Sequence, residues 1–515
     1  MGDLGSLLEG FQTVLSPTAL LFAAVGVTLG TLVGVMPGIG PAVTIALLLP
    51  VATQFDDPIP AFIMFAGIYY GAMYGGSTTS ILLNTPGESA SVATAIEGNL
   101  MARRGEARAA LATAAIGSFV AALISTVLLA LVAEPAASAA VSIQATSYVA
   151  IMILALATVT ALVGKSVVRG LISLMIGMMF AIVGLDPQSG QTRFTFGSTE
   201  LFGGIEDVLI VIGLFAVGEV LYVLSRRQEH EKGAVLALGE RGRGFLWLTR
   251  DQWRRSWGPW LRGAGFGFPF GAMPSGGAEL PTFLSYSYEK NRSRGKDEFG
   301  TGAIEGVAGP EAANNASFTG VLVPLLTLGI PTSATAAVMI AAFKQFNIQP
   351  GPQLFTTSGD LVWALIASLF VGNVLLLILN LPLINVWVKV LSVPTPVLYS
   401  GILVFASLGI YASSGNATQV TLSIAIGVLG FFMRKLDFPI APTILGAILA
   451  TEMERQFRRA MVSSNDDLSV FWTRPVTVVI LVLAVAAFAL PHVPRLMARA
   501  RGGRGGNRLS FGDED

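Results

Sequence analysis

An apolar stretch that prolines and glycines interrupt limits most strongly what this chain can fold into. Nearly every residue from 18 to 53 is apolar or small, as in a membrane span, yet its centre reads Met36-Pro37-Gly38-Ile39-Gly40-Pro41. Each proline removes a helix hydrogen bond, and each glycine permits backbone angles that other residues resist. The stretch therefore predicts two helices joined by a bent tip. Such irregular backbone is tolerated at membrane depth only where protein buries it or it lines a watery cavity.

The interruption occurs a second time at a corresponding place. The frame Gly-x-x-x-Gly-x-Met-Pro-x-x-Gly of residues 30–40 recurs at residues 267–277. A single interruption could be an ordinary loop between two spans. Two of them, one in each half of the chain, are the best sequence indication of the binding site of a secondary transporter. We therefore predict two homologous halves.

The composition and the charge distribution favour a chain that lies mostly in lipid. Hydrophobic residues make up 53% of the 515 residues and charged residues only 12%, which is about half the charged share of a typical soluble protein. Residues 1–102 contain no Lys or Arg, whereas residues 226–262 contain nine. Because cytoplasmic loops carry the excess of positive charge, this basic stretch indicates a cytoplasmic anchor and not a nucleic-acid-binding segment. The absence of cysteine excludes disulfides, thiolate catalysis and cysteine metal sites.

The predicted fold class is an all-α polytopic integral membrane protein with two inverted structural repeats. Each repeat contains a broken, re-entrant helical hairpin, and about 11 spans complete the fold. The uninterrupted spans are expected at about 109–133, 145–163, 167–184, 205–225, 361–381, 396–413, 418–433, 437–451 and 474–491. Basic loops placed inside put the N-terminus outside and the C-terminus in the cytoplasm, although Arg455, Arg458 and Arg459 then also lie outside.

The expected organisation follows from these assignments. It consists of an N-terminal interfacial segment 1–17, a first repeat 18–225, a basic cytoplasmic linker 226–262, a second repeat 263–452, a final loop and span 453–492, and a basic cytoplasmic tail 493–515.

A second pair of interruptions is expected where hydroxyl-rich segments follow apolar runs. An alignment of Gly76 with Gly329 sets Thr79-Ser80 against Thr332-Ser333 and predicts a helix break at each glycine. Serine and threonine can bond back to the carbonyls of their own helix, but four in a row followed by Asn84-Thr85-Pro86 favour the break. The glycines at four-residue spacing just before this segment are typical of close helix packing; they are Gly67, Gly71 and Gly75.

The charge of an anionic solute must be met without basic side chains, because none lies inside the four broken segments. The positive ends of half-helices that start after Pro37, Gly76, Pro274 and Pro331 could meet it, as could bound sodium ions, which prefer oxygen ligands. The expected substrate-binding residues are Pro37, Gly38, Ile39, Gly40, Ser77, Thr78, Thr79, Asn84, Thr85, Pro274, Ser275, Gly276, Gly277, Pro331, Thr332 and Ser333. The candidates for ion coupling are Ser80, Glu279, Asn314 and Asn315.

Several polar residues beside the breaks leave two interpretations open. Glu88, Glu279 and Glu311 could relay protons, or they could sit in flanking aqueous loops. The pair Asn314-Asn315 could bind an ion, or it could cap the following helix.

An enzymatic function lacks the residues it would need. The chain has two histidines, His230 in the basic linker and His492 after the last span, and neither has a plausible catalytic partner nearby. Gly164-Lys165-Ser166 resembles the end of a phosphate-binding loop, but Val159 stands where that motif needs glycine. We expect no enzyme, no metal centre and no cofactor other than Na⁺ as a coupling ion.

Several long motifs resemble those of a known family. The segments 30–40, Tyr70 to Glu88, Gly184-Leu185-Asp186-Pro187 with Arg193 to Gly197, and Gly309 to Asn315 followed by Thr327 to Pro331 are similar to the large permease subunit of tripartite tricarboxylate transporters. The resemblance extends over roughly residues 10–490. It implies ligand-contacting elements at Pro37 to Gly40, at Ser77 to Ser80 with Asn84 and Thr85, at Pro274 to Gly277, and at Gly329 to Ser333.

The resemblance also implies a bacterial inner-membrane permease that imports a carboxylate such as citrate. Its expected partners are a small four-span membrane subunit, a periplasmic solute-binding protein and the lipid bilayer, with no nucleic acid, and it could form a homo-oligomer. A sodium or proton gradient would drive alternating access, by an elevator or a rocking motion. The alternative is a passive channel or a membrane scaffold whose breaks serve packing alone.

Overall fold

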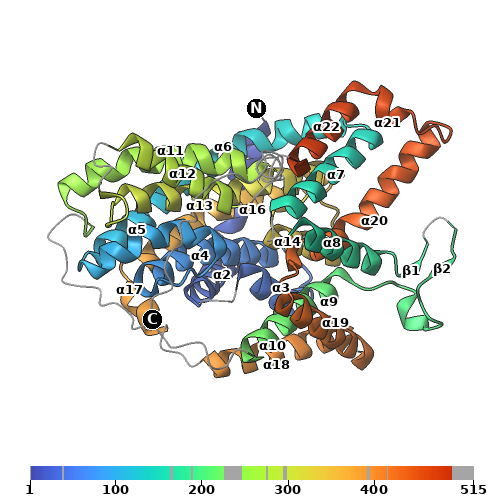
Figure 1. The fold of residues 1–515 in the computed structure, drawn as a ribbon, viewed down its shortest axis with the longest axis horizontal. Helices are drawn as coiled ribbons and strands as arrows, with labels where there is room; N and C mark the ends of the chain where they lie inside the picture. Colours follow the sequence, from blue (N-terminus) through green and yellow to red (C-terminus); the bar gives the residue numbers. More distant parts are fainter. Residues whose placement is uncertain are drawn as a thin grey trace, which may run out of the picture.

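The protein is built almost entirely of helices in the computed structural model (Figure 1). The structure describes residues 2–36, 40–162, 166–186, 189–225, 246–273, 277–293, 298–390, 395–414 and 416–489. Within these residues one pair of short antiparallel strands is found, in which Gly184 is opposite Arg193. The predicted basic linker lies partly, and the predicted tail 493–515 entirely, outside the described residues.

The described residues of the first part of the chain form ten α-helices. They and the shorter elements are α1 (Gly2–Val14), α2 (Pro17–Val35), α3 (Pro41–Ala52), α4 (Pro58–Leu83), a 3-10 turn (Ser89–Ser91), α5 (Val92–Arg103), α6 (Ala107–Val141), α7 (Ala145–Leu162), α8 (Val167–Ala181), β1 (Gly184–Leu185), β2 (Thr192–Arg193), a 3-10 turn (Thr199–Leu201), α9 (Asp207–Val211), a π-helical segment (Ile212–Val217) and α10 (Gly218–Ser225).

The remainder of the chain forms the other twelve α-helices of the described residues. They are α11 (Arg250–Ala272), α12 (Glu279–Arg292), α13 (Glu305–Leu328), α14 (Ala334–Gln345), α15 (Leu354–Thr357), α16 (Gly359–Asn380), α17 (Ile384–Val390), α18 (Thr395–Ser414), α19 (Ala417–Lys435), α20 (Ile440–Ser463), α21 (Val470–Thr473) and α22 (Pro475–Ala489).

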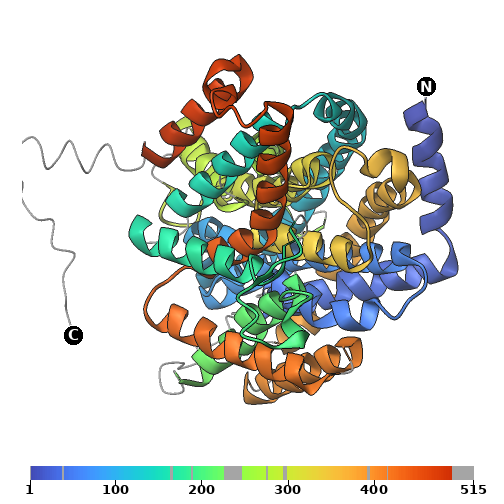
Figure 2. The same ribbon diagram turned by 90° about the vertical axis from the view of Figure 1, so that its right-hand side faces the viewer.

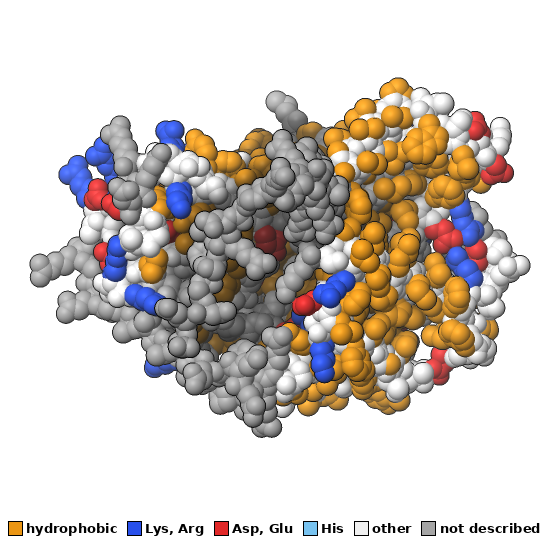
Figure 3. Space-filling model, in the orientation of Figure 1, with side chains coloured by type: hydrophobic (Ala, Val, Ile, Leu, Met, Phe, Trp, Pro, Cys, Tyr) orange, Lys and Arg blue, Asp and Glu red, His pale blue; other side chains and the backbone are white. Residues whose placement is uncertain are grey.

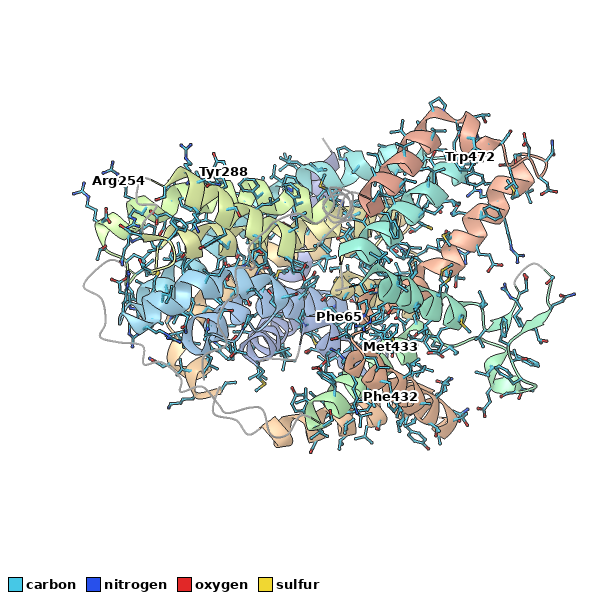
Figure 4. The ribbon with its side chains drawn as sticks, viewed as in Figure 1. Phe65, Arg254, Tyr288, Phe432, Met433 and Trp472 are labelled. Atoms are coloured by element: carbon cyan, nitrogen blue, oxygen red, sulfur yellow. The ribbon has the colours of Figure 1, made fainter. Side chains whose placement is uncertain are left out.

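Five helical stretches of the described residues are long and apolar enough to cross a membrane. They are Pro17–Val35, Ala107–Val141, Asp207–Ser225, Gly359–Asn380 and Ala417–Lys435, and shorter apolar helices accompany them. Hydrophobic side chains cover most of the right-hand surface in Figure 3, whereas charged side chains gather at the left-hand end and the right-hand tip. Phe65 lies in the interior, and Phe432 and Trp472 point outward (Figure 4). The predicted all-α membrane class is confirmed.

Glycines bring α2 and α4 into backbone contact. A Cβ atom added at Gly26, Gly30 or Gly34 would lie 2.2 to 2.4 Å from the carbonyl oxygens of Met64, Ile68 and Ala72, respectively. Successive glycines of α2 thus meet successive residues of α4, so the two helices run parallel. Because parallel neighbours need a returning segment between them, α3 must run back from the end of α2. The predicted packing role of Gly67, Gly71 and Gly75 is confirmed, since each faces the backbone of α2 at 2.9 Å or less.

The second half repeats this arrangement with the same register. A Cβ atom added at Gly263, Gly267 or Gly271 of α11 would lie 2.2 to 2.4 Å from the carbonyl oxygens of Gly309, Ala313 and Ser317 of α13. These three glycines each follow the α2 glycines by 237 positions, and their three partners each follow the α4 partners by 245. The α11–α13 pair is therefore also parallel, and α12 supplies the return.

The predicted break at Gly76 is wrong. Helix α4 is continuous from Pro58 to Leu83 because its hydroxyl groups donate to carbonyls of their own helix: Ser77 Oγ to Tyr74 O at 2.7 Å and Ser80 Oγ to Gly76 O at 2.9 Å. The helix ends instead at Asn84, in the left-handed conformation with φ of 53°. Its counterpart 245 positions later is Gly329, which ends α13 with φ of 67°. The alignment of Gly76 with Gly329 was therefore incorrect, and Asn84 takes the place of Gly76.

Helices α7, α8, α20 and α22 form a second group beside this core. Gly177 of α8 faces the carbonyl of Thr443 in α20, and the hydroxyls of Ser147 in α7 and Thr477 in α22 lie 2.9 Å apart. Both views show these helices together on one side of the molecule, with α18 and α19 along another edge (Figures 1 and 2). The core helices α2, α4, α11 and α13 are thus flanked by helices without interruptions.

Candidate functional site

The helix interruptions pack against one another in pairs. In the second half, Thr332 Oγ1 donates to the carbonyl oxygen of Gly271 at 3.1 Å, so the loop after α13 lies against the end of α11. In the first half, Gly87 is so close to the carbonyl of Gly34 that an added Cβ atom would lie 2.2 Å from it. Gly271 follows Gly34 by 237 positions, the offset between α2 and α11, and Thr332 follows Gly87 by 245, the offset between α4 and α13. The two contacts are therefore equivalent in the two halves.

Direct hydrogen bonds join the interruptions of the two halves. Ser89 Oγ donates to Glu279 Oε1 at 2.5 Å, between the loop after α4 and the start of α12. Asn314 Nδ2 of α13 donates to Glu88 Oε1 at 3.0 Å. The hydroxyls of Tyr69 and Ser333 lie 2.8 Å apart. The loop after α4, the tip before α12 and the loop before α14 therefore meet in one place, which we call the junction.

Four short helices begin at these interruptions. They are α3, α5, α12 and α14, which start at Pro41, Val92, Glu279 and Ala334. Ser333 caps α14 by accepting from Ala336 N at 3.1 Å, and Glu88 and Ser91 cap the 3-10 turn before α5. Unpaired N–H groups and the positive end of the macrodipole make helix starts suited to anions. Helices α5, α12 and α14 thus have their positive ends at or next to the junction.

A row of buried polar residues on α13 borders the junction. Glu311, Asn314 and Asn315 are each 0% exposed. Thr94 Oγ1 donates to Glu311 Oε1 at 2.5 Å, and Asn315 Nδ2 donates to Ser118 Oγ at 2.6 Å. The aqueous-loop interpretation of Glu311 is therefore wrong, as is the capping interpretation of the two asparagines, because all three lie well inside a continuous helix.

The sequence-predicted site residues fall into three groups. Gly277, Thr332, Ser333, Glu279 and Asn314 lie at the junction, and Pro331 lies in the loop that contributes to it. Ser77, Thr78, Thr79 and Ser80 are buried within α4, Asn315 is buried within α13, Gly40 precedes α3, and Asn84 and Thr85 are exposed beyond the end of α4. The tip residues Pro37, Gly38, Ile39, Pro274, Ser275 and Gly276 lie outside the described residues.

The sequence reasoning missed several residues that complete the junction. Tyr69 reaches Ser333 from the middle of an apolar run, and Ser89 and Thr94 meet glutamates that are 190 and 217 positions away. Their only local signal was polarity next to an apolar segment. No spacing rule pairs residues at such separations, so these contacts needed the fold.

A cavity of about 1240 Å³ opens beside α14, next to the loop that joins α13 to α14. It reaches the α13 interruption at Leu328 and Gly329, and four basic residues line it: Lys344, Arg455, Arg459 and Arg474. Lys344 pairs with Asp207 at 2.8 Å and Arg455 with Glu452 at 2.9 Å, whereas no ion pair of Arg459 is seen among the described residues. The cavity is larger than most small-molecule sites, and its walls carry both signs of charge.

Beyond this cavity, an ion cluster ties the β1–β2 loop to α20. Arg458 pairs with Asp186 at 2.8 Å and with Glu454, and Arg193 pairs with Glu454 at 3.1 Å. Hydrogen bonding to Asp186 raises the pKa of the Arg458 guanidinium above its ordinary value, so this residue stays charged at every physiological pH. The arginines that the topology placed outside are thus neutralised in part by nearby acids.

Most of the chain matches one known protein family. Residues 20–445 match the model of the family described as "Tripartite tricarboxylate transporter TctA family". The chain is 45% identical over 499 residues to an "Uncharacterized 52.8 kDa protein in TAR-I ttuC' 3'region" of Agrobacterium vitis, which covers 97% of this chain and 98% of the relative. It is 44% identical over 229 residues to an "Uncharacterized protein in TAR-II ttuC' 3'region" of the same organism, which covers 44% of this chain and 95% of the relative. No solved structure matches the chain. The chain therefore belongs to the tripartite tricarboxylate transporter TctA family.

Proposed function

We propose that this chain is the permease subunit of a tripartite transporter that imports a carboxylate by alternating access, driven by a cation gradient. The family description supports a tricarboxylate transporter with further subunits. The observation that carries the proposal is the junction, where interruptions from both halves meet and short helices begin. A scaffold that needed only packing would be served by the glycine seams and would not need several interruptions in one place.

The two halves would be inverted repeats, and the contacts between them support this. Along α4, Phe62 stacks on Phe343 at 4.1 Å, Tyr70 contacts Phe318 at 4.9 Å, and Glu88, just beyond the helix, bonds Asn314. Successive residues of the first half thus meet ever earlier residues of the second, first in α14 and then in α13, so α4 runs opposite to the segment formed by α13 and α14. Because α2 is parallel to α4 and α11 to α13, the two hairpins would enter the membrane from opposite sides.

The carboxylate would bind at the starts of the short helices. Backbone N–H groups and helix dipoles bind anions without a basic side chain, and α14 presents its start close to the Tyr69 hydroxyl. The first turn of α12 already carries the acidic side chain of Glu279, and the Glu88 side chain caps the 3-10 turn before α5. We therefore assign the anion to the starts of α14 and α3 and the acidic pair to the cation side of the site.

The other parts of the proposal follow from the family and from the charge distribution. The protein would lie in the bacterial inner membrane with its N-terminus in the periplasm, beside a small four-span subunit, and a periplasmic binding protein would deliver the carboxylate. The 1240 Å³ cavity would be the access path from the periplasm, since it reaches the α13 interruption and has arginines on its wall. A sodium or proton gradient would supply the energy, and the core would move as an elevator against the uninterrupted helices.

The test is uptake of radiolabelled di- and tricarboxylates into proteoliposomes that contain this chain with its small membrane partner. Uptake is measured with and without the binding protein and with inward Na⁺ or H⁺ gradients. We expect accumulation above the external concentration that needs both the gradient and the binding protein. Equilibration without accumulation would indicate a passive channel, and no flux of any carboxylate with all partners present would indicate a scaffold.

A further inference from the structure

We propose that Glu311, Asn314 and Asn315 of α13 form a binding site for one small monovalent cation, and that Na⁺ is the ion it fits. The inference rests on the proposed function, because it names the coupling ion of the same transport site. It is carried by buried oxygen atoms that lack hydrogen-bond donors, and these can be examined without any transport assay.

The three side chains share one face of a buried helix segment. Positions 311, 314 and 315 are related as i, i+3 and i+4, so their side chains are neighbours on the surface of α13. All three are 0% exposed. Glu311 Oε2, Asn314 Oδ1 and Asn315 Oδ1 have no hydrogen-bond partner among the described residues. Three acceptor oxygens without donors thus lie within one helical turn.

Neighbouring elements determine which oxygen atom of each side chain remains without a hydrogen-bond donor. Thr94 of α5 occupies Glu311 Oε1 at 2.5 Å, and Glu88 takes the amide hydrogen of Asn314 at 3.0 Å. Ser118 of α6 takes that of Asn315 at 2.6 Å. Because each amide nitrogen is engaged, both amide groups are oriented with the oxygen as the free end. Three different elements therefore leave three acceptors rather than a mixture of donors and acceptors.

A monovalent cation accounts for these acceptors better than a proton does. An unpaired buried carboxylate is costly, as is each buried amide oxygen without a donor. A proton on Glu311 Oε2 could bond to one amide oxygen and would leave the other unsatisfied. A Na⁺ ion takes oxygen ligands from all three, and its single charge balances the single carboxylate in contact with it. A divalent ion would leave an excess positive charge in a buried site.

The equivalent face of α4 shows that packing alone does not need these residues. The equivalent residues of α4, which lie 245 positions earlier, are Ala66, Tyr69 and Tyr70, and none of their side chains carries a carboxylate or an amide. The two helices make the same glycine contacts with their partners. The polar row is therefore specific to the second half, and we expect one such ion per chain.

The experiment measures Na⁺ binding to the purified full chain in lipid nanodiscs. Melting is followed at constant ionic strength as NaCl replaces choline chloride, and ²²Na⁺ binding is counted at equilibrium. The wild-type Tm should rise by about 1 °C for each tenfold increase in Na⁺ above its Kd. In the same preparation about one ²²Na⁺ should bind per chain, as the single carboxylate implies. Glu311→Gln, which keeps an acceptor for Thr94 and removes the charge, should lose both effects. Glu106→Gln, which alters an exposed carboxylate outside the junction, should retain them.

Clear outcomes would overturn the inference. They are a wild-type Tm and ²²Na⁺ count unaffected by Na⁺, Na⁺ binding that survives in Glu311→Gln, or a stabilisation that follows pH with no dependence on Na⁺. If Glu311→Gln fails to fold, the wild-type ²²Na⁺ count and a second variant still decide whether this site binds Na⁺. The second variant is Asn315→Ala, which removes one ligand and should weaken Na⁺ binding at least tenfold. Carboxylate accumulation without Na⁺ binding would refute this site and leave the proposed function intact. Na⁺ binding without carboxylate accumulation would support this site and refute the proposed function.

Discussion

The glycine seam between α11 and α13 allows a substitution whose effect can be worked out from the structure. A Cβ atom at Gly267 would lie 2.3 Å from the carbonyl oxygen of Ala313 and 2.7 Å from the Cβ atom of Ala316. Since carbon and oxygen atoms that are not bonded approach to about 3.3 Å, Gly267→Ala must push the two helices apart by about 1 Å. The matched control is Gly265→Ala on the same helix, where an added Cβ atom meets nothing within 4 Å.

The two variants share one contribution and differ in the other. Both replace glycine by alanine inside a helix, which favours the helix by up to about 1 kcal/mol. Only Gly267→Ala forces a methyl group into a backbone contact, and overpacking of this kind costs about 1–3 kcal/mol. The separated helices also lose dispersion contacts along the seam, because a gap of 0.5–1 Å forfeits about a quarter to a half of each contact energy. We expect Gly267→Ala to be less stable than Gly265→Ala by about 3 kcal/mol.

Thermal unfolding of the purified variants in nanodiscs measures this difference. Gly265→Ala should melt at or slightly above the wild type, and Gly267→Ala about 3 °C below Gly265→Ala. Because the seam holds α11 against the helix that carries Glu311, carboxylate uptake by Gly267→Ala should also fall. Equal melting temperatures for the two variants would refute the reasoning, since the helices would then be shown to separate at no cost.

Three further substitutions probe other parts of the molecule. Glu97 accepts hydrogen bonds from three backbone N–H groups of residues 300–303 and from a tyrosine hydroxyl. Glu97→Gln sets an amide NH₂ group against two of these donors, so it should lower the free energy of unfolding by about 2–5 kcal/mol and expose residues 300–303 to limited proteolysis. The control, Glu106→Gln at an exposed position, should do neither. Tyr69→Phe removes one buried hydrogen bond at the junction, worth about 1 kcal/mol, and should slow uptake about fivefold with an unchanged oligomeric state on gel filtration. Arg459→Gln should raise the KM for the delivered carboxylate at low salt more than Arg455→Gln does, because Arg455 is already paired with an acid; equal effects of the two would argue against an anion path through the cavity.

Much of the fold could be predicted because it depends on local rules. Long apolar runs identify spans, and the starts of α3 and α4 follow from Pro41 and from Asp57-Pro58. The repeated Met-Pro frame also identified the corresponding ends of α2 and α11. In each case the signal lies within a dozen residues, where proline, glycine and capping side chains act directly on the backbone.

The error at Gly76 shows where such rules fail. A glycine pair followed by four hydroxyl residues looks like a break, but Ser77, Thr79 and Ser80 each donate to a carbonyl three or four residues earlier. Gly75 serves the seam with α2, and Gly76 faces Glu88 in the loop after α4. Asn84, an ordinary polar residue at the end of an apolar run, ends the helix instead. The choice between these two sites depends on what α2 presents to α4, which the sequence of α4 does not contain.

The junction shows the same limit for function. The sequence singled out Glu88, Glu279 and Glu311 because each lies beside a break, and of the three it made only Glu279 a candidate for ion coupling. In the fold they are distinct: Glu279 bonds a serine at an exposed helix start, Glu88 orients an asparagine, and Glu311 is fully buried with one oxygen unsatisfied. Only the last has the environment in which a carboxylate must find a cation or a proton. The free acceptor oxygens of Glu311 and its neighbours lie on α13, in the second half of the chain. Thr94 and Ser118, whose hydrogen bonds leave these oxygens free, come from the first half. The chemistry that would couple an ion gradient to carboxylate movement is therefore decided by packing between the two halves.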